Sequence, residues 1–199
     1  AYLGPAGTFT EAALRQITKE SDVLIPYSNV TAALDAVRDG KAEKVLVPIE
    51  NSVEGVVSRT LDELALGTPL VVTAETTLPV AFSLMTLPES AGVEITKIAT
   101  HPHAESQCRA FVAKNYPLAE IIEMSSTAAA AKGLANGNYD AAIASEIAAK
   151  NYGLKVIASN IGDNTGAVTR FVVAEKPGTL PAPTGNDRTS LVAFIGIDH

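Results

Sequence analysis

Apolar and polar positions along the chain alternate in a way that predicts short strands followed by helices. Apolar runs typical of buried strands lie at residues 1–3, 23–27 and 44–49. Each run is followed by apolar residues at helical spacing, and Thr8 with Glu11 matches a capping box at the first helix. Ser28 or Asn29 caps the second helix, which Gly40 ends. This repeated strand, loop and helix order predicts an α/β fold with a mostly parallel sheet.

The alternation is broken once and then starts again. Residues 70–87 form a long extended run rich in Val, Thr and Leu, with Pro79 inside it. Further strands are predicted at residues 98–100, 121–124, 141–144, 155–161 and 169–175. We therefore expect two α/β lobes with mostly parallel sheets and a ligand cleft between them. Residues 1–75 and 159–178 form lobe 1, and residues 76–158 form lobe 2, inserted into lobe 1.

The C-terminal stretch has a different character. Residues 179–186 contain Pro and Gly and are typical of a linker. Residues 187–199 include another apolar strand with nothing after it to pair with. A strand that ends a chain after a linker predicts the start of a further domain.

Composition and charge narrow the possible functions. Of 199 residues, 47% are hydrophobic and 19% are charged, which is typical of a soluble globular protein. The formal net charge is −7 and no cluster of Lys and Arg occurs, so we expect no nucleic-acid partner and only local attraction for an anion. The single cysteine, Cys108, fits a reducing compartment, and no transmembrane run or signal peptide is visible. We expect a cytoplasmic protein without a membrane partner.

Polar side chains gather after the predicted strands, where open α/β sheets bind their ligands. The candidates are Glu50, Asn51, Ser52, Thr100, Gln107, Ser126, Thr127, Thr169 and Arg170. The hydroxyl of Thr169 and the guanidinium of Arg170, at the mouth of a strand, suit an oxygen-rich anion. The plainer interpretation is a surface turn with an ion-paired Arg, and ordinary helix capping also explains residues 50–52.

Two further motifs allow more than one interpretation. Gly7 and Thr8 would bind an anion through backbone N–H groups at a helix start, although a plain strand-to-helix turn is the favoured interpretation. His101 and His103 look like a metal pair, but no Cys or Asp stands at ligand spacing beside them. Helix initiation at Pro102 is therefore favoured, and no metal is expected.

Five motifs together resemble prephenate dehydratases, the enzymes of phenylalanine biosynthesis. They are Gly4-Pro5-Ala6-Gly7-Thr8-Phe9-Thr10, Pro48-Ile49-Glu50-Asn51-Ser52-Val53-Glu54-Gly55, His101-Pro102 with Gln107-Cys108, Ser126-Thr127-Ala128, and Thr169-Arg170-Phe171. They occur in the family's order from residue 4 to residue 171. The chain departs from the pattern at Gly166 and Ala167, where many members have an Asn pair, and at His103, where Gln is frequent.

The resemblance carries expectations for the whole protein. It implies a two-lobed fold similar to type II periplasmic binding proteins, with the site between the lobes. It implies the conversion of prephenate into phenylpyruvate, water and CO2 without a cofactor. It also implies that residues 187–199 resemble the first strand of an ACT domain, through which L-phenylalanine usually regulates this family. A homodimer or homotetramer is expected.

The resemblance also implies roles for individual residues. Thr169 is expected to be catalytic, hydrogen-bonding the leaving hydroxyl and helping to protonate it. The residues expected to contact the substrate are Glu50, Asn51, Ser52, Thr100, Gln107, Ser126, Thr127, Arg170 and Phe171. Arg170 either pairs with a substrate carboxylate or, slightly favoured, binds a protein carboxylate, and Glu50 is either protonated by burial or orders its loop. Two other functions stay open: an arogenate dehydratase, and a non-catalytic protein of the same fold that binds a small anion.

Overall fold

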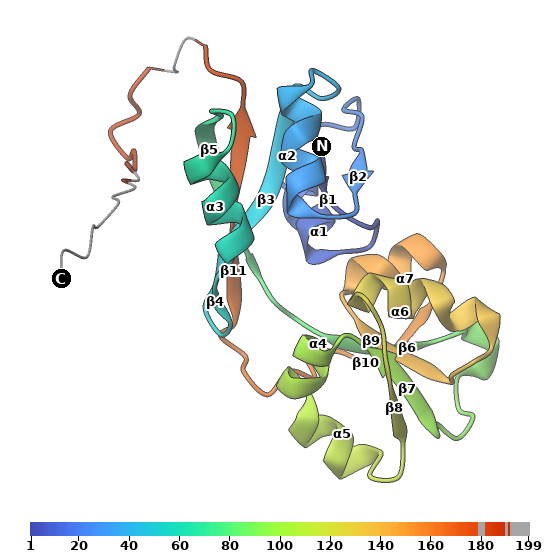
Figure 1. The fold of residues 1–199 in the computed structure, drawn as a ribbon. Coiled ribbons are helices and arrows are strands. Elements are labelled where there is room, and N and C mark those ends of the chain that lie inside the picture. The colour runs from blue at the N-terminus through green and yellow to red at the C-terminus, as the bar shows by residue number, and fades with distance from the viewer. Residues whose placement is uncertain (179–181, 190, 192–199) are drawn as a thin grey trace, which may run out of the picture.

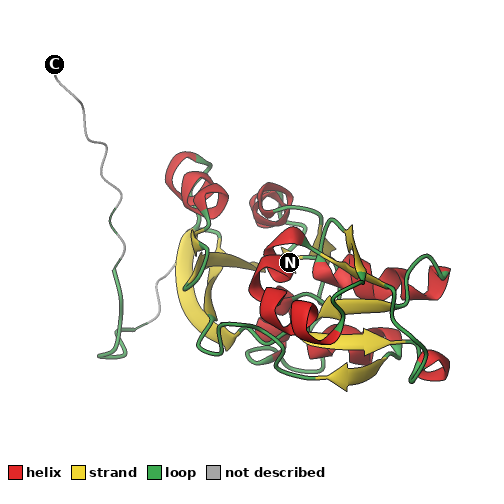
Figure 2. Ribbon diagram, turned by 90° about the horizontal axis from the view of Figure 1, so that it is seen from below, coloured by secondary structure: helices red, strands yellow, loops and turns green. Residues whose placement is uncertain are grey.

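Two β-sheets, each flanked by helices, form two lobes (Figure 1; helices red and strands yellow in Figure 2). The computed structural model describes residues 1–178, 182–189 and 191. The first lobe consists of β1 (Tyr2–Leu3), α1 (Phe9–Arg15), β2 (Pro26–Tyr27), α2 (Val30–Arg38), β3 (Lys44–Asn51), β4 (Gly55–Val56), α3 (Ser58–Leu66), β5 (Val71–Pro79) and β11 (Val168–Glu175). The second consists of β6 (Ser83–Thr86), η1 (Pro88–Ser90), β7 (Lys97–Thr100), α4 (Pro102–Gln107), α5 (Arg109–Asn115), β8 (Glu120–Glu123), α6 (Thr127–Gly133), η2 (Leu134–Asn136), β9 (Ala141–Ala144), α7 (Glu146–Tyr152) and β10 (Lys155–Ala158).

Both sheets are mixed, which corrects the expectation of mostly parallel sheets. The first has the order β2-β1-β3-β11-β5 with β4 paired to β3, and its strand β11 is antiparallel to both β3 and β5. The second has the order β10-β6-β9-β7-β8, and β6 is antiparallel to β9 and β10. The physical reason is the double connection between the lobes. The chain leaves along β5 and returns along β11 beside it, so these two strands run in opposite directions.

The predicted boundary between residues 75 and 76 falls inside β5 and is corrected here. β5 stays paired with β11 as far as Pro79, which lies opposite Val168. The strand belongs to the first sheet over its whole length because this pairing continues through the predicted boundary. The predicted linker, residues 179–186, and the predicted ACT strand, residues 187–199, lie partly outside the described residues. Residues 182–189 and 191 contain no helix or strand.

Local signals in the sequence set the helix ends of the first lobe. The Asn29 side chain caps α2 by accepting the backbone N–H of Ala32 at 2.8 Å. Gly40, with φ of 76°, turns the chain after α2 in a backbone conformation that other residues resist. α1 begins at its predicted cap Thr8 and ends at Arg15.

Side chains along β3 alternate between two faces of the first sheet. Val45 and Val47 pack with the α2 side chains Leu34 and Val37. Leu46 points to the other face and packs in the cluster that contains residues of α1. Helices therefore cover this sheet on both sides, and the same alternation decides where the polar residues at the end of β3 point.

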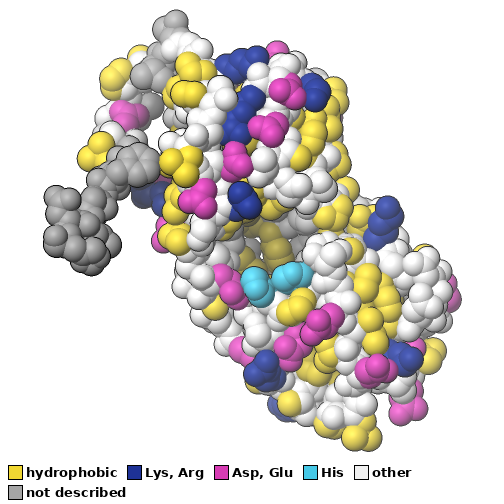
Figure 3. All heavy atoms as spheres, viewed as in Figure 1, with side chains coloured by type: hydrophobic (Ala, Val, Ile, Leu, Met, Phe, Trp, Pro, Cys, Tyr) yellow, Lys and Arg dark blue, Asp and Glu magenta, His cyan; other side chains and the backbone are white. Residues whose placement is uncertain are grey.

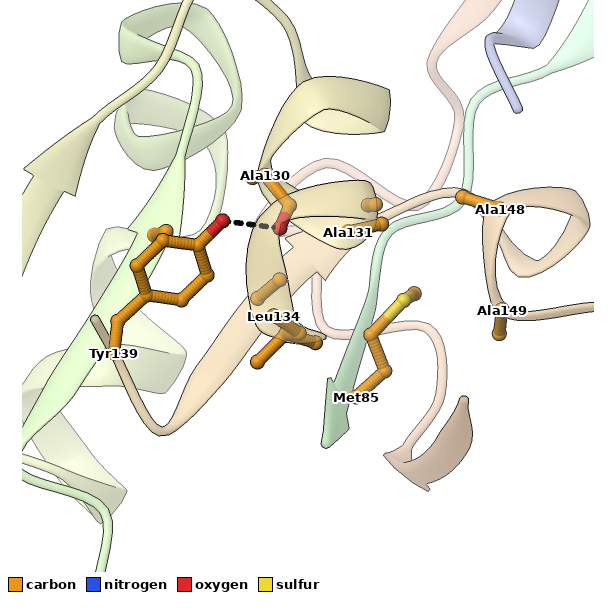
Figure 4. Close-up of a cluster of buried hydrophobic side chains, with 10 residues drawn as sticks. Met85, Ala130, Ala131, Leu134, Tyr139, Ala148 and Ala149 are labelled. Atoms are coloured by element: carbon orange, nitrogen blue, oxygen red, sulfur yellow. Dashed lines mark hydrogen bonds between the residues drawn. The ribbon is translucent and has the colours of Figure 1, made fainter. Parts of the chain in front are cut away.

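The core of the second lobe is built mainly from small side chains. Ala130 of α6 and Ala148 of α7 pack with Met85 of β6 (Figure 4). The Tyr139 hydroxyl donates a hydrogen bond to the Ala130 carbonyl at 2.7 Å, so the buried ring leaves no unpaired hydroxyl. Gly133 leaves room for this ring, because a Cβ there would collide with the Tyr139 hydroxyl.

Candidate active site

The parallel strands of both lobes direct their carboxyl ends toward the same region. In the first lobe β1 is parallel to β3, and in the second β7 is parallel to β8 and β9. The Ser145 hydroxyl, just after β9, donates to the Gly7 carbonyl, which follows β1, at 2.8 Å. Figure 3 shows a hollow between the lobes with the cyan histidine side chains on its rim. The carboxyl ends of open α/β sheets are where ligands bind, which makes this cleft the candidate site.

Thr169 and Asn51 form a polar pair at the first lobe's side of this cleft. They lie opposite each other in the antiparallel pairing of β11 and β3, and Thr169 is only 8% exposed. The Asn51 Nδ2 donates to the Thr169 Oγ1 at 2.8 Å. A hydroxyl has a single proton, so an oxygen that accepts from Asn51 keeps that proton for another acceptor. Thr169 is thereby oriented as a hydrogen-bond donor.

Glu50 and Arg170 lie on the opposite face of the sheet from Thr169. They are the next cross-strand pair, and successive side chains of a strand point to opposite faces. The Arg170 guanidinium donates to the Glu50 Oε2 at 2.9 Å and to the Glu75 Oε2 at 3.3 Å. Arg170 therefore binds protein carboxylates, the alternative that the sequence slightly favoured, and Glu50 is engaged in ordering this face.

Two other residues expected at the substrate are also placed elsewhere. Phe171 is 1% exposed and packs in the core on the α1 side of the sheet. Ser52 accepts the backbone N–H of Val168 through its hydroxyl at 2.9 Å, and with Glu50 and Arg170 it lines a pocket of about 400 Å³. The expectation that Glu50, Ser52, Arg170 and Phe171 contact a ligand beside Thr169 is thus not matched by their positions.

Gln107 reaches across the cleft from the second lobe. Its Nε2 donates to the Glu54 Oε1 at 3.0 Å, and the His103 Nδ1 lies 3.9 Å from the Glu54 Oε2. Glu54 belongs to the turn between β3 and β4. This turn follows Asn51, the last residue of β3, which holds Thr169. The structure therefore brings Gln107 to the same end of β3 as the Thr169–Asn51 pair.

The other residues predicted in the second lobe serve the fold to different degrees. Thr100 is fully buried and its hydroxyl donates to the Ile143 carbonyl at 2.9 Å, so it is not available to a ligand. Ser126 caps α6 by accepting the N–H of Ala129 at 3.0 Å. Thr127 is half-buried at the first position of α6. These last two residues stand just after β8, at the carboxyl edge of the second sheet.

The turn at Gly7 and Thr8 is occupied by the protein's own groups. The Gly7 N–H donates to the Glu11 Oε2 at 2.6 Å, and the Thr8 hydroxyl donates to the Leu3 carbonyl at 3.3 Å. The alternative of a turn that binds an anionic ligand is therefore corrected, because the anion that Gly7 binds is the carboxylate of Glu11. Glu11 also accepts from the Asn151 side chain of the second lobe at 3.0 Å, which makes the turn an inter-lobe contact.

Titratable groups near the cleft have altered proton affinities. Burial, and then the neighbouring His103, lower the pKa of His101, which caps α4 by accepting the His103 N–H at its Nδ1. Burial raises the pKa of Cys108 to about 12, so this thiol is not a nucleophile at neutral pH. Among residues 1–178, 182–189 and 191, no three His, Cys, Asp or Glu side chains are grouped so as to hold a metal ion.

The sequence did not point to Glu54 as a residue of the cleft. It lies inside a matched motif, but only the hairpin of β3 and β4 brings it toward Gln107, 53 positions away in the chain. The signal available in the sequence was Gly55, whose φ of 85° allows the tight turn after Glu54. Nothing in the periodicity indicated which lobe the Glu54 side chain would face.

Comparison with known proteins identifies the family. The family model for prephenate dehydratase matches residues 1–179. This chain belongs to the prephenate dehydratase family. The prephenate dehydratase of Amycolatopsis methanolica is 47% identical over 194 residues, which cover 97% of this chain and 63% of that protein. The chain thus spans less than two thirds of the length of this relative. The resemblance of the sequence motifs to this family is confirmed.

Solved structures agree with the fold. The prephenate dehydratase of Arthrobacter aurescens in complex with L-Phe is 48% identical, with a TM-score of 0.84 over 92% of this chain and 61% of that chain. GqqA, described as a novel type of quorum quenching acylase, is 29% identical, with a TM-score of 0.77 over 92% of this chain and 66% of that chain. The predicted two-lobed α/β class is confirmed. No helix within residues 1–178, 182–189 and 191 is both long and apolar enough to cross a bilayer.

Proposed function

We propose that this chain is the catalytic part of a prephenate dehydratase, a carbon–oxygen lyase that converts prephenate into phenylpyruvate, CO2 and water. The observation that carries the proposal is the Thr169–Asn51 pair at the cleft, in a chain of this family. Thr169 accepts from Asn51 and keeps its own proton as a donor. Such a donor suits a reaction in which a hydroxyl group must leave.

The chemistry needs only one proton beyond the substrate. Electrons of the breaking carbon–carboxylate bond move into the ring as CO2 leaves, and they expel the hydroxyl on the opposite ring carbon. That hydroxyl takes up a proton through Thr169, which recovers one from solvent, and departs as water while the ring becomes aromatic. Thr169 donates its hydrogen bond to the leaving oxygen. Its burial strengthens the bond, because water that would compete for the hydroxyl is largely excluded.

The dianionic substrate is held by groups of both lobes. Gln107 of the second lobe and Asn51 of the first supply amide donors near Thr169. Ser126 and Thr127, at the start of α6, receive a substrate carboxylate near the positive end of the helix backbone. Arg170 and Glu50 act indirectly, by fixing the pairing of β11 and β3 from the other face of the sheet.

The wider organisation follows the family. Residues 179–186 link the catalytic lobes to an ACT domain that begins with residues 187–199, and L-phenylalanine is its effector. The L-Phe complex of the Arthrobacter aurescens relative supports this choice of effector. The protein acts in the cytoplasm, in aromatic amino-acid biosynthesis, as a homodimer or homotetramer.

The likeness to GqqA suggests an acylase as a second candidate function. Acyl transfer needs an activated nucleophile. Thr169 has an amide as its hydrogen-bond partner rather than a base, and burial raises the pKa of Cys108 to about 12. The geometry therefore favours the dehydratase, in which no nucleophile of the protein attacks the substrate.

The deciding experiment follows phenylpyruvate formation from prephenate by the purified protein, with arogenate in a parallel assay and a chelator in both. We expect turnover of prephenate that survives the chelator. Turnover of arogenate alone would change the substrate to the aminated analogue. Saturable binding of either compound in a calorimeter without turnover would favour a non-catalytic binding protein and overturn the proposal.

A further inference from the structure

Glu54 is the residue through which the first lobe contacts Gln107 of the second. Its carboxylate accepts a hydrogen bond from the Gln107 Nε2 at 3.0 Å and lies 3.9 Å from the His103 Nδ1. The Glu54 side chain is 38% exposed, so water weakens these contacts without removing them. The contact spans the cleft at its α4 side, where the histidines stand on the rim in Figure 3.

The turn that carries Glu54 is fixed by the same amide that holds Thr169. The Asn51 Oδ1 accepts the backbone N–H of Val53 at 2.8 Å and that of Glu54 at 3.0 Å. The Asn51 Nδ2 donates to Thr169. A continuous set of hydrogen bonds therefore runs from the Thr169 hydroxyl through Asn51 to the Glu54 turn and on to Gln107.

The backbone of Gln107 is fixed independently. Its carbonyl accepts the N–H of Asp163 at 2.6 Å, and the Asp163 carboxylate accepts the N–H of Ala110 at 3.1 Å. Asp163 lies in the segment that leads back into β11 and Thr169. The main chain at Gln107 is thus anchored, and Glu54 determines where its side-chain amide points.

We propose that Glu54 is a positioning residue that holds the cleft closed and aims the Gln107 amide at the position of the substrate. This inference rests on the proposed dehydratase function, because it names a positioning residue of that same site. Glu54 does not touch the reacting atoms. It raises the fraction of molecules whose lobes are closed before the substrate arrives, and the apparent affinity for the substrate rises with that fraction.

Steady-state kinetics of Glu54→Ala and Glu54→Gln test the proposal. Glu54→Ala should raise KM about three- to tenfold and change kcat less than about twofold. The reason is that the variant loses a partly exposed hydrogen bond to a charged group, which favours the closed lobes before the substrate binds. Glu54→Gln keeps a side-chain oxygen that accepts from Gln107, so it should restore KM to within about twofold of the wild type. Glu105→Ala is the matched control, because Glu105 pairs with Arg109 inside the second lobe.

Two kinetic results would overturn the proposal. A large loss of kcat in both Glu54 variants at unchanged KM would assign Glu54 a direct part in the chemistry. Kinetics of Glu54→Ala equal to those of Glu105→Ala would leave Glu54 without any positioning role.

A distance measurement separates this inference from the proposed function. Spin labels on cysteines placed at the exposed Glu43 and Lys114 report the separation of the lobes, and the buried Cys108 stays unlabelled. Glu54→Ala should lengthen and broaden the distance distribution, and Glu54→Gln should not. An unchanged distribution in Glu54→Ala excludes the closing role whether or not the protein turns over prephenate. Absence of turnover in the wild type instead rejects the proposed function, while the distances still test the closing role.

Discussion

Thr169 is a donor by virtue of a single neighbour. Without Asn51 the hydroxyl would rotate freely and present either its proton or its lone pairs. The Asn51 amide proton occupies the oxygen at 2.8 Å, which directs the Thr169 proton to any other acceptor in the cleft. An ordinary hydroxyl thereby becomes a positioned donor that can hydrogen-bond the leaving hydroxyl and help to protonate it.

Replacement of this hydroxyl should reduce turnover strongly. We expect Thr169→Ala to lower kcat by about 10²–10⁴-fold, because a positioned proton donor contributes this much to a transition state. Thr169→Ser keeps the hydroxyl and should keep most of the activity. Stopped assays of phenylpyruvate formation measure kcat, and thermal unfolding shows whether each variant is folded. Near-normal turnover by a folded Thr169→Ala protein would remove the proton-transfer role from Thr169.

His101 should make the stability of the protein depend on pH. Burial and then His103 lower its pKa in the folded state, so the unfolded state binds more protons below the ordinary value of 6.5. The stability that depends on His101 should therefore be highest above pH 6.5. It should fall as the pH decreases from 6.5 through the lowered pKa of His101 in the folded protein. His101→Asn keeps a side chain that caps α4 but does not titrate.

Urea unfolding at pH 7 and pH 5 provides the measurement for His101. The wild type should lose more stability than His101→Asn between these two pH values. An equal loss in both proteins would show that His101 is not the source of the acid sensitivity.

At the scale of the elements, periodicity predicted the order of strands and helices but not their pairing. The apolar run at residues 44–49 correctly predicted β3, yet the strand continues through Asn51 because β11 pairs with it there. Thr169 and Asn51 are 118 positions apart, and no local pattern indicates that they are partners. The pairing decides the site, because it places Thr169 and Asn51 on one face and Arg170 and Glu50 on the other.

Local β-strand propensity also predicted the start of one strand wrongly, at a residue whose side chain is not buried in the folded protein. A strand was predicted from residue 23, but β2 begins at Pro26, and Val23 is 82% exposed. The β-branched side chain suits a strand, but β1 pairs with β2 only at Pro26 and Tyr27. Thr8 and Asn29 were correctly predicted as helix caps, since each acts within its own segment.

Arg38 joins two helices of the first lobe and should be important for stability. Its guanidinium donates to the Glu63 carboxylate at 2.7 Å and to the Glu63 carbonyl at 2.8 Å, which ties α2 to α3. Both side chains are largely buried, at 11% and 14% exposure. Arg38→Ala should lower the free energy of unfolding by about 2–3 kcal/mol, because it leaves a carboxylate and a carbonyl without this donor.

The pH dependence of this pair offers an internal check. Hydrogen bonds from Arg38 and then Thr31 lower the pKa of Glu63 in the folded protein. Stability from this pair is therefore present above the ordinary value of 4.5 and is lost as the pH falls through the folded pKa. The difference between wild type and Arg38→Ala in denaturant unfolding should shrink at acidic pH. Lys41→Ala is a suitable control, because its ion pair with Asp39 lies at the surface.

At the scale of the whole molecule, the cleft lies between two sheets that are joined by two segments of the chain. The chain leaves the first lobe along β5 and returns along β11, which pairs with β5. The strands of the second sheet, β6 to β10, lie between these two strands in the sequence. The presence of two lobes followed from a restart of the strand and helix pattern. The contacts that orient them did not follow from the sequence, because they involve a backbone carbonyl at Gly7 and a buried Glu11 that the capping signal assigned to α1 alone.

The contact between α7 and the Gly7 turn should set the relative orientation of the lobes. The Asn151 side chain donates to Glu11 at 3.0 Å, and the Tyr152 hydroxyl donates to the Ala6 carbonyl at 2.7 Å. Burial and then the charge of Glu11 raise the pKa of Tyr152, so it remains a donor at neutral pH. Together these two bonds connect the start of α1 to the end of α7.

Removal of both donors should loosen the lobes before it unfolds either of them. We expect the double variant Asn151→Ala with Tyr152→Phe to lose about 2–4 kcal/mol of stability, because one bond to a charged acceptor and one to a neutral carbonyl disappear. Hydrogen exchange should then accelerate at Gly7, whose N–H bonds to Glu11, while amides of the β7–β9 pair keep their protection. Asn115→Ala is the control, because its side chain bonds within α5, to the Phe111 carbonyl. Equal acceleration at Gly7 and in β7 would mean that the second lobe itself unfolds, and the contact with α7 would then stabilise that lobe rather than orient it.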